Sequence, residues 1–450
     1  MLTFFAVLAW TIAVVIYPGF SLLELVGANH VWVSATMMSS YQAVVVGPTT
    51  DFIESNTPLK MKPQKTFADV PNPSVMIVIG GGDTTYAAME NQELVDYIRK
   101  AAQSAEIVAS ISTGALLLAK AGLLQGKLAT THWAYASQLE GYGASYVRKA
   151  WVEDGKLITG AGASAAIDLS LLLVARLLGE KNAKQVQIMA EWDPKPPFGG
   201  IDWSRINGKP AFPVAGPSQG PERIIALVIY NGLTVFDLVG PLELVTALSR
   251  MRPEFKPVVV AERAEPITSD SGLTFLPNKS FDEVPEPDVL IVPGGGQPTL
   301  RAMSNLAIRE YIRQADRSTT YTTSVCTGAL LLASVGMLKG RDATTHWGYS
   351  KHLEQFGARY LRQRWVAAGK IINSAGVSAG IDMALYLISR LTDEETARQV
   401  QLAIQYDPQP PFGDIDYDHF PPMMRAIRGL QYLTAPLDTR KPKQLLENGL

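Results

Sequence analysis

The sequence repeats its main motifs once, at the scale of a whole domain. The offset is 214 residues for most motifs, as between His132 and His346, and 213 near the start of the chain. A period this long exceeds that of solenoid repeats and matches an independent domain. The paired segments are 80–82 with 294–296, 110–114 with 324–328, 129–133 with 343–347, and 193–199 with 407–413.

We therefore predict two related domains in the chain of 450 residues. Copy one covers residues 1–202 and copy two covers 223–416. The Pro-rich stretch 203–222 is the expected linker, and 417–450 forms a tail. A short helical piece is expected at 423–430, but the tail is too short for a helix-turn-helix module.

Composition narrows the function classes. Hydrophobic residues make up 47% of the chain, enough for two cores, and the net charge of −2 favours neither nucleic acid nor an anionic membrane as partner. A single cysteine excludes an internal disulfide and argues against a thiolate zinc site. Five histidines leave little material for a metal cluster, so no metal is expected.

The N-terminus has two interpretations. Residues 1–23 carry no charged side chain, which is compatible with a membrane anchor. However, the first lysine is Lys60, so the basic start of a signal peptide is missing. The repeat aligns 10–17 with 223–230, which predicts a buried strand and leaves only 1–9 unexplained. A cytoplasmic protein is favoured, and membrane association is the less favoured alternative.

Each copy alternates strands and helices, which predicts an α/β fold with a doubly wound, mainly parallel sheet. The apolar run 224–230 has the length and composition of a strand buried on both faces. In copy two the further expected strands are 257–261, 289–292, 320–325 and 370–373, and the expected helices are 242–250, 300–315, 329–335 and 381–391.

Cys326 lies where a nucleophile would be expected. A β-prone run precedes it and an apolar helical run follows, so the sulfur sits at a strand–turn–helix junction. Small residues on both sides, Ser324 and Gly328, permit the sharp bend of a nucleophile elbow. The start of the following helix would favour a thiolate. The alternative is a buried cysteine that acts only as a small hydrophobic residue.

Other polar features of copy two fall at the same expected sheet edge, where open α/β sheets gather ligands. Asp237 follows the first strand, and His346 follows 343–345. Singly, Asp237 is explained as a helix N-cap and His346 as a core histidine. Together with Cys326 they suggest nucleophilic catalysis. The glycine turn, either a tight turn or a set of oxyanion donors, consists of Gly294, Gly295 and Gly296.

These segments together resemble the ThiJ/PfpI superfamily, which has a class I glutamine amidotransferase-like fold, and both copies fit. Asp237, Thr327 and the ending 406–412 make copy two most similar to its isonitrile hydratase branch. Regulators of the AraC type share most motifs but add a DNA-binding domain, which we do not expect here. The motifs are Ile229-Tyr230-x-Gly232-x(4)-Asp237-x-x-Gly240-Pro241, Pro293-Gly294-Gly295-Gly296, Ser324-Val325-Cys326-Thr327-Gly328, Ala343-Thr344-Thr345-His346-Trp347 and Ser374-Ala375-Gly376-Val377-Ser378-Ala379-Gly380-Ile381-Asp382.

The resemblance implies two tandem flavodoxin-like sandwiches and a catalytic role for several residues. Cys326 would be the nucleophile, Asp237 the proton shuttle or water activator, and Thr327 a donor to the bound intermediate. His346 would lie near the sulfur. Thr327, not histidine, follows the cysteine, which puts peptidase activity in doubt.

The implied activity is a cofactor-free lyase that adds water to an isonitrile and gives an N-substituted formamide. Two alternatives stay open. One is a non-catalytic binding or redox-sensing protein in which Cys326 is oxidised. The other is a glyoxalase- or deglycase-like activity. The partner in each enzymatic case is a small molecule.

Copy one departs from these motifs at the reactive positions. Ser112 replaces the cysteine and Glu24 replaces Asp237, with His132 nearby. We expect this degenerate site to be silent and copy one to act as the second half of an intramolecular pseudo-dimer, with further homo-oligomerisation open. A serine-based site is the alternative.

The run 160–165 matches a dinucleotide pattern, but its small residues are better explained by close helix–sheet packing.

Overall fold

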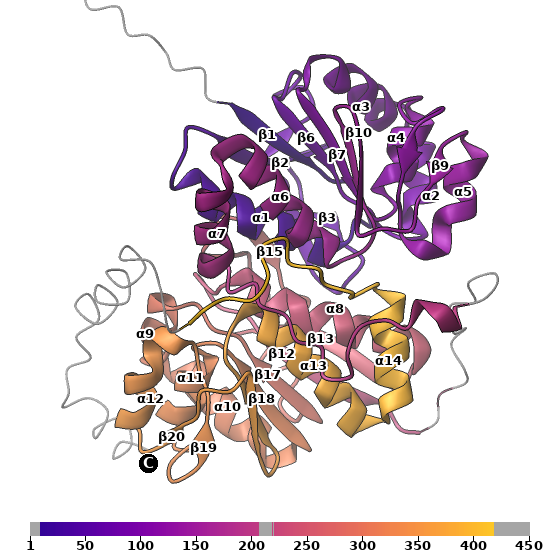
Figure 1. Ribbon diagram of the computed structural model, residues 1–450. Coiled ribbons are helices and arrows are strands. Elements are labelled where there is room, and N and C mark those ends of the chain that lie inside the picture. Colours follow the sequence, from indigo (N-terminus) through magenta and orange to yellow (C-terminus); the bar gives the residue numbers. More distant parts are fainter. Residues whose placement is uncertain (1–9, 207–217, 219, 418–450) are drawn as a thin grey trace, which may run out of the picture.

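The computed structural model describes residues 10–206, 218 and 220–417, and these form two α/β sandwiches (Figure 1). Residues 1–9, most of the expected linker and the expected helical piece at 423–430 lie outside the described residues. Copy one runs from indigo to magenta in Figure 1, and copy two from pink through orange to yellow. No helix within the described ranges is long and apolar enough to cross a bilayer.

The elements of copy one follow the predicted alternation. They are β1 (Thr11–Val15), α1 (Leu22–Thr36), β2 (Gln42–Gly47), β3 (Ile53–Glu54), β4 (Lys60–Lys62), β5 (Lys65–Thr66), β6 (Val75–Val78), α2 (Thr84–Met89), α3 (Gln92–Ser104), β7 (Ile107–Ile111), α4 (Gly114–Lys120), β8 (Leu128–Ala129), α5 (Ala136–Gly141), β9 (Ser145–Tyr146), β10 (Trp151–Asp154), β11 (Leu157–Gly160), α6 (Ala165–Leu178) and α7 (Glu180–Met189).

Copy two repeats this order element by element. It comprises β12 (Arg223–Val228), α8 (Val235–Met251), β13 (Phe255–Ala261), β14 (Ile267–Thr268), β15 (Thr274–Leu276), β16 (Lys279–Ser280), β17 (Val289–Val292), α9 (Gln297–Ala302), α10 (Leu306–Ser318), β18 (Tyr321–Val325), α11 (Gly328–Ser334), β19 (Asp342–Ala343), α12 (Ser350–Gln355), β20 (Arg359–Tyr360), β21 (Trp365–Ala368), β22 (Ile371–Ser374), α13 (Val377–Leu391) and α14 (Glu394–Ala403).

Each copy contains a seven-stranded sheet of the same topology. The order is β10-β11-β7-β6-β1-β2-β5 in copy one and β21-β22-β18-β17-β12-β13-β16 in copy two. All neighbours are parallel except the outermost hairpins, β10 with β11 and β21 with β22. Central strands such as β17 are apolar and buried along their whole length, because helices cover both faces. The predicted doubly wound α/β fold is confirmed in both copies.

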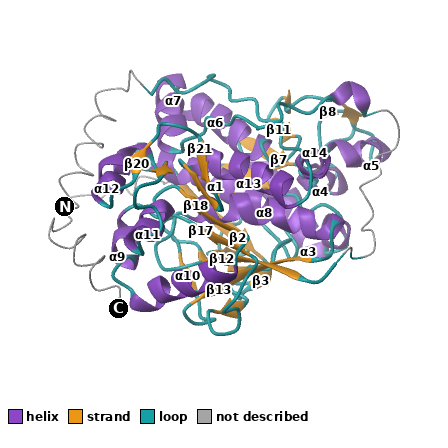
Figure 2. Ribbon diagram, turned by 90° about the horizontal axis from the view of Figure 1, so that it is seen from below, coloured by secondary structure: helices purple, strands orange, loops and turns teal. Residues whose placement is uncertain are grey.

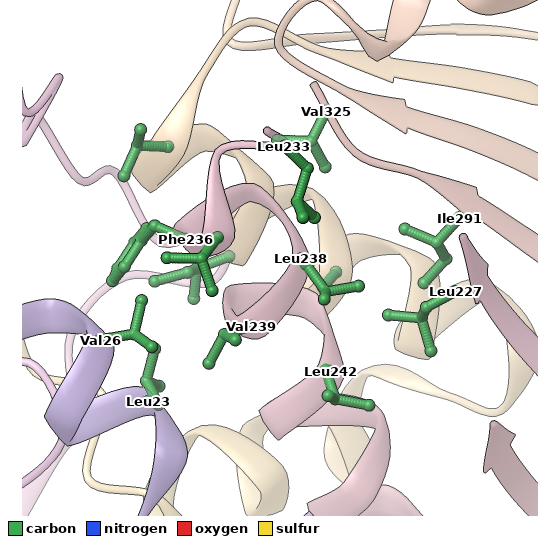
Figure 3. Packing of buried hydrophobic residues seen from close by; sticks show 14 of the residues in the cluster. Leu23, Val26, Leu227, Leu233, Phe236, Leu238, Val239, Leu242, Ile291 and Val325 are labelled. Atoms are coloured by element: carbon green, nitrogen blue, oxygen red, sulfur yellow. The ribbon is translucent and has the colours of Figure 1, made fainter. Parts of the chain in front are cut away.

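The two copies share one hydrophobic core. Helices α1 and α8 pack against each other, and one buried cluster continues through both domains. Figure 3 shows Leu23 and Val26 of α1 facing Phe236 and Val239 of α8. Seen from below, α1, α8 and α13 lie side by side between the sheets (Figure 2). Strand β15 also pairs antiparallel with β4 across the boundary. The copies therefore pack as an intramolecular pseudo-dimer.

Two segments cross between the copies after their last helices. The first crossing segment, 190–206, lies on copy two, where the Lys195 N–H donates to Asp382 Oδ2 at 2.8 Å. The second, 404–417, makes the mirror contact on copy one, from the Gln409 N–H to Asp168 Oδ2 at 2.8 Å. Each copy therefore contributes a segment of its backbone that lies against the other copy.

Several predicted boundaries differ from the structure. Helix α8 begins at Val235, is preceded by Thr234 as its N-cap, and runs through Pro241, so the expected start at 242 is wrong. Asp237 therefore lies in the first turn and is not an N-cap. The expected helix 300–315 is two helices, because Asn305 interrupts it and caps α10 by accepting two backbone N–H bonds.

Candidate active site

Cys326 occupies the sharp turn between β18 and α11. Its φ of 56° lies in the left-handed region, which non-glycine residues adopt rarely and mostly at functional sites. Ser112 at the matching turn of copy one has φ 53°. A Cβ at Gly328 would lie 2.1 Å from the Val292 carbonyl oxygen, so only glycine fits there. The predicted elbow geometry is present in both copies.

The backbone of Cys326 is anchored on two sides. Its N–H donates to the Ser374 carbonyl at 3.0 Å, and its carbonyl accepts from Thr345 Oγ1 at 2.9 Å. The same two contacts recur around Ser112. Cys326 is 6% exposed, so little of it meets solvent. The turn therefore holds the thiol in a fixed, largely enclosed position.

The predicted resting thiolate is wrong. Burial raises the pKa of Cys326 well above its ordinary value, and the carboxylates of Asp237 and Glu191 raise it further. The Thr327 N–H lowers this pKa, but by less. Desolvation in a hydrophobic core outweighs the start of a short helix. A reactive sulfur at this position needs a group beside it that accepts its proton.

Asp237 is the buried acid beside the sulfur. Burial raises its pKa well above the ordinary value, and the negative charges of Glu191 and Asp270 act in the same direction. The Cys326 thiol and the Gly294 N–H lie close enough to lower the pKa of Asp237, but by less than burial raises it. Neither contact reaches full hydrogen-bond geometry, and within the described residues the carboxylate oxygens have no other partner. Burial therefore favours the protonated form of Asp237.

The glycine turn positions Thr327. The N–H groups of Gly295 and Gly296 both donate to Thr327 Oγ1 at 3.0 Å, and this hydroxyl also bonds Thr299 Oγ1 at 2.8 Å. The Gly294 N–H is directed at the acid. The expected oxyanion donors are thus already engaged, and so is the Thr327 hydroxyl. The backbone N–H of Thr327 is the donor left beside the sulfur.

His346 follows β19, a strand of a small separate sheet, and precedes the 3-10 turn Trp347–Tyr349. Its Nδ1 accepts from the Gly348 N–H at 3.0 Å, which places the ring proton on Nε2. Nε2 lies 3.2 Å from Glu191 Oε1. Both ring nitrogens are engaged, so the role of a base toward sulfur or water does not fit His346. It orients a carboxylate instead.

Glu191 is the functional candidate that sequence reasoning missed. It lies in the first crossing segment and so brings a carboxylate from copy one to copy two. It is buried and has φ 45°. The repeat contained the signal, because the matching residue of copy two is Gln405. At this mirror pair of positions, copy two receives a carboxylate and copy one receives an amide.

A cavity of about 160 Å³ lies beside the segments that anchor the Cys326 turn, although neither Cys326 nor Asp237 belongs to its lining. Its lining includes Glu191, Thr345 and Gly376, all of which belong to segments that touch the Cys326 turn or His346. Arg364 and Ser378 also line it. The volume suits a small organic molecule and a few waters.

The copy-one site has the same frame, with Ser112 at its elbow and Glu24 as its buried acid. Glu24 accepts from the Gly80 N–H at 2.9 Å and contacts the Ser112 hydroxyl, and burial raises the pKa of Glu24 to about 8. Burial lowers the pKa of His132 to about 4. His132 Nδ1 accepts a backbone N–H, and Nε2 lies 3.1 Å from the Ala403 carbonyl oxygen. Its ring is therefore committed to backbone contacts.

Copy one nevertheless encloses a larger space. Ser112, Glu24 and His132 line a cavity of about 550 Å³ to which α8 and α14 of copy two also contribute. The dinucleotide pattern at 160–165 has a packing explanation. A Cβ at Gly162 would lie 2.4 Å from Gln405 Cβ, so the space beside this glycine is filled by the second crossing segment.

The chain is similar in sequence and structure to several known proteins. An isonitrile hydratase of Pseudomonas putida is 40% identical over 190 residues, which span 42% of this chain and 80% of that protein. A deglycase of Thermococcus kodakarensis is 30% identical over 136 residues, 30% of this chain and 81% of the relative. A crystal structure of a ThiJ/PfpI family protein from Pseudomonas syringae aligns with 34% identity and a TM-score of 0.45, and covers 54% of this chain and 98% of that one. The DJ-1/PfpI family profile matches residues 10–176 and 224–390, so the chain belongs to this family as two tandem copies.

Proposed function

We propose that copy two is a cofactor-free, cysteine-dependent hydro-lyase that adds water to an isonitrile and releases an N-substituted formamide. The observation that carries this proposal is the pairing of Cys326, in its strained elbow, with the fully buried acid Asp237 beside it, whose protonated form is favoured by burial. The similarity to an isonitrile hydratase supports the choice of substrate.

The first step needs a proton donor and a soft nucleophile at the same carbon. The terminal carbon of an isonitrile accepts a proton from Asp237 while the Cys326 sulfur attacks it. Asp237 takes the thiol proton in return, so the acid ends the step protonated. The S–H bond has then added across the isonitrile carbon to give a thioimidate. General acid–base assistance of this kind contributes about 10²–10⁴ in rate.

The second step hydrolyses the thioimidate. Water adds to its carbon, and the nitrogen gains a proton. Collapse forms the carbonyl, breaks the C–S bond and returns a proton to sulfur. The backbone N–H of Thr327 lies where it would stabilise charge at the reacting centre. The product is the formamide, and Cys326 is regenerated as a thiol.

The test is turnover of ethyl isonitrile, with formamide detected by NMR, in wild type and two alanine variants. We expect activity in the wild type, loss to background in Cys326→Ala, and full activity in Ser112→Ala. Activity that survives Cys326→Ala and disappears in Ser112→Ala would move the reaction to copy one.

The similarity to a deglycase supports a second candidate, the conversion of reactive dicarbonyl compounds by the same sulfur. Assaying methylglyoxal beside ethyl isonitrile compares the two. Consumption of methylglyoxal without formamide formation would favour this candidate. If neither substrate is consumed but mild peroxide gives a stable sulfinate at Cys326, a redox sensor replaces both.

A further inference from the structure

We infer that Glu191 of copy one is a catalytic residue of copy two, where its carboxylate removes the proton from the water that hydrolyses the Cys326 adduct. The inference rests on the proposed hydratase function and adds to it a residue from the other half of the chain. Copy one, with a silent elbow of its own, would then be required for the reaction in copy two.

The backbone of Glu191 is held in a strained conformation by copy two. Its φ is 45°, and within the described residues the non-glycine residues with positive φ are the two elbow residues, Glu191 and Gln405. The Glu191 carbonyl accepts from Ser378 Oγ at 2.7 Å. The Asp193 N–H donates to the same Ser378 oxygen at 3.2 Å. Such strain persists only where surrounding contacts enforce it. The contacts from Ser378 therefore fix the position of the Glu191 backbone.

The side chain of Glu191 lies between the two segments that anchor Cys326. On one side Oε1 meets His346, the residue after the threonine that binds the Cys326 carbonyl. On the other side Oε2 lies against Gly376, where a Cβ would come within 1.5 Å of it. Gly376 is two residues beyond Ser374, which accepts the Cys326 N–H. The carboxylate is therefore brought to the elbow from both flanks.

Electrostatics agree with this placement. The negative charge of Glu191 raises the pKa of both Cys326 and Asp237, so the carboxylate lies close enough to interact electrostatically with both. It also lines the cavity of about 160 Å³. In the reaction inferred here, a water from this cavity would meet the Glu191 carboxylate before it reaches the carbon bound to sulfur.

The mirror position shows what is specific to copy two. Gln405 has φ 50° and accepts from the Trp133 N–H at 3.0 Å. The mirror of His346 is His132, which contacts a backbone carbonyl and not a carboxylate. An imidazole–carboxylate pair from opposite copies thus occurs in copy two, whereas the mirror residues His132 and Gln405 of the serine site contact backbone groups.

The step balances with groups already present. Glu191 takes one proton from water as the oxygen bonds to the thioimidate carbon, and the nitrogen takes a proton from Asp237. Collapse of the tetrahedral intermediate breaks the C–S bond, and the hydroxyl proton passes to Asp237. The proton on Glu191 returns to sulfur. His346 keeps its Nε2 proton throughout and acts as a positioning residue.

The test compares wild type, Glu191→Gln and the matched control Gln405→Glu with ethyl isonitrile. Glutamine occupies the mirror position at the same backbone conformation, so Glu191→Gln is expected to fold. We expect its kcat to fall about 10²-fold, while kcat/KM, which reports the first attack, changes less than about threefold. Intact mass spectrometry should then show Cys326 carrying one substrate. Gln405→Glu should match wild type.

Equal losses in kcat and kcat/KM without an adduct would overturn the inference, because they indicate a structural role. An unchanged kcat would overturn it as well. If the wild type itself is inactive, the proposed function fails, and iodoacetamide labelling tests Glu191 separately. Cys326 is the single cysteine, and loss of the neighbouring negative charge should speed its alkylation severalfold. Identical labelling rates would show that the carboxylate does not act on the sulfur.

Discussion

The elbows of the two copies have nearly the same backbone and different chemistry. Their φ values are 56° and 53°, and both peptides make the same two anchoring hydrogen bonds. They differ in the atom at the tip, sulfur in Cys326 and oxygen in Ser112, and in the residue received from the other copy, Glu191 or Gln405. The repeat has kept the frame of a site in both halves, whereas the sulfur and the carboxylate of Glu191 both belong to the site of copy two.

The largest difference should appear at the buried acids. Asp237→Asn removes the proton that the isonitrile carbon needs and should lower kcat/KM about 10²–10⁴-fold. The mirror change Glu24→Gln should leave turnover within about twofold, because Glu24 contacts a serine. Steady-state kinetics with ethyl isonitrile check both variants. Similar losses in the two would mean that the copies cooperate more closely than we propose.

A second difference concerns a cation found in copy two alone. Arg364 bonds the buried Asp382 and, through Asp193, the crossing segment that carries Glu191, whereas the mirror of Arg364 is Ala150. Arg364→Met should leave a buried carboxylate without its cation and cost about 3–5 kcal/mol in the free energy of unfolding. Urea denaturation measures this cost.

The matched control is Asp168→Asn, which changes the mirror carboxyl of copy one. Asp168 accepts from Trp192 Nε1 and the Gln409 N–H, and burial raises its pKa to about 7. The loss should be about 1 kcal/mol, since a hydrogen bond and not an ion pair is weakened. Equal costs for the two variants would remove the distinction between the copies.

The same substitution at the two elbow glycines, Gly328 and Gly114, should have similar effects on stability and different effects on activity. A Cβ would lie 2.1 Å from a carbonyl oxygen at Gly328 and 2.2 Å at Gly114. Each alanine variant should lose about 1–3 kcal/mol of stability through overpacking. Only Gly328→Ala should also lower the activity per folded molecule, because only that elbow carries the sulfur. Thermal denaturation beside an activity assay separates the two effects.

The fold was predictable from the sequence because its signals are local and occur twice. Apolar runs such as 224–230 have the length and composition of strands, and the matching segment of the other copy supports each assignment. The errors arose where neighbours override local rules. Pro241 lies inside α8, and Asn305 divides an apparently continuous helix. Neither outcome follows from the residue type alone.

The site was predictable only within one copy. Cys326 and Asp237 come from the same half, and the motif order places them together. Glu191 arrives from the other half by a crossing segment, so no spacing in the sequence relates it to Cys326. The protonation of the site was also missed, because the pKa of Cys326 depends on how completely the fold buries it. The sequence shows that Glu191 and Gln405 occupy matching positions of the repeat. Only the structure shows that Glu191 lies beside His346 of the other copy.

The smallest expected difference is a pH dependence of stability that originates in copy one. The pKa of Glu24 is raised from 4.5 to about 8 by burial. Between these values the folded state holds a proton that the unfolded state releases, so this contribution to stability is complete below the unfolded pKa and is lost as pH rises toward 8. Glu24→Gln cannot release a proton and still offers an oxygen to the Gly80 N–H. From pH 6 to 7.5 we expect wild type to lose about 1 kcal/mol per pH unit more than the variant. Urea denaturation at several pH values measures the two slopes, with Ser112→Ala expected to follow wild type. Parallel slopes in wild type and Glu24→Gln would show that Glu24 is already ionised, and that the two elbows differ less in charge than their burial implies.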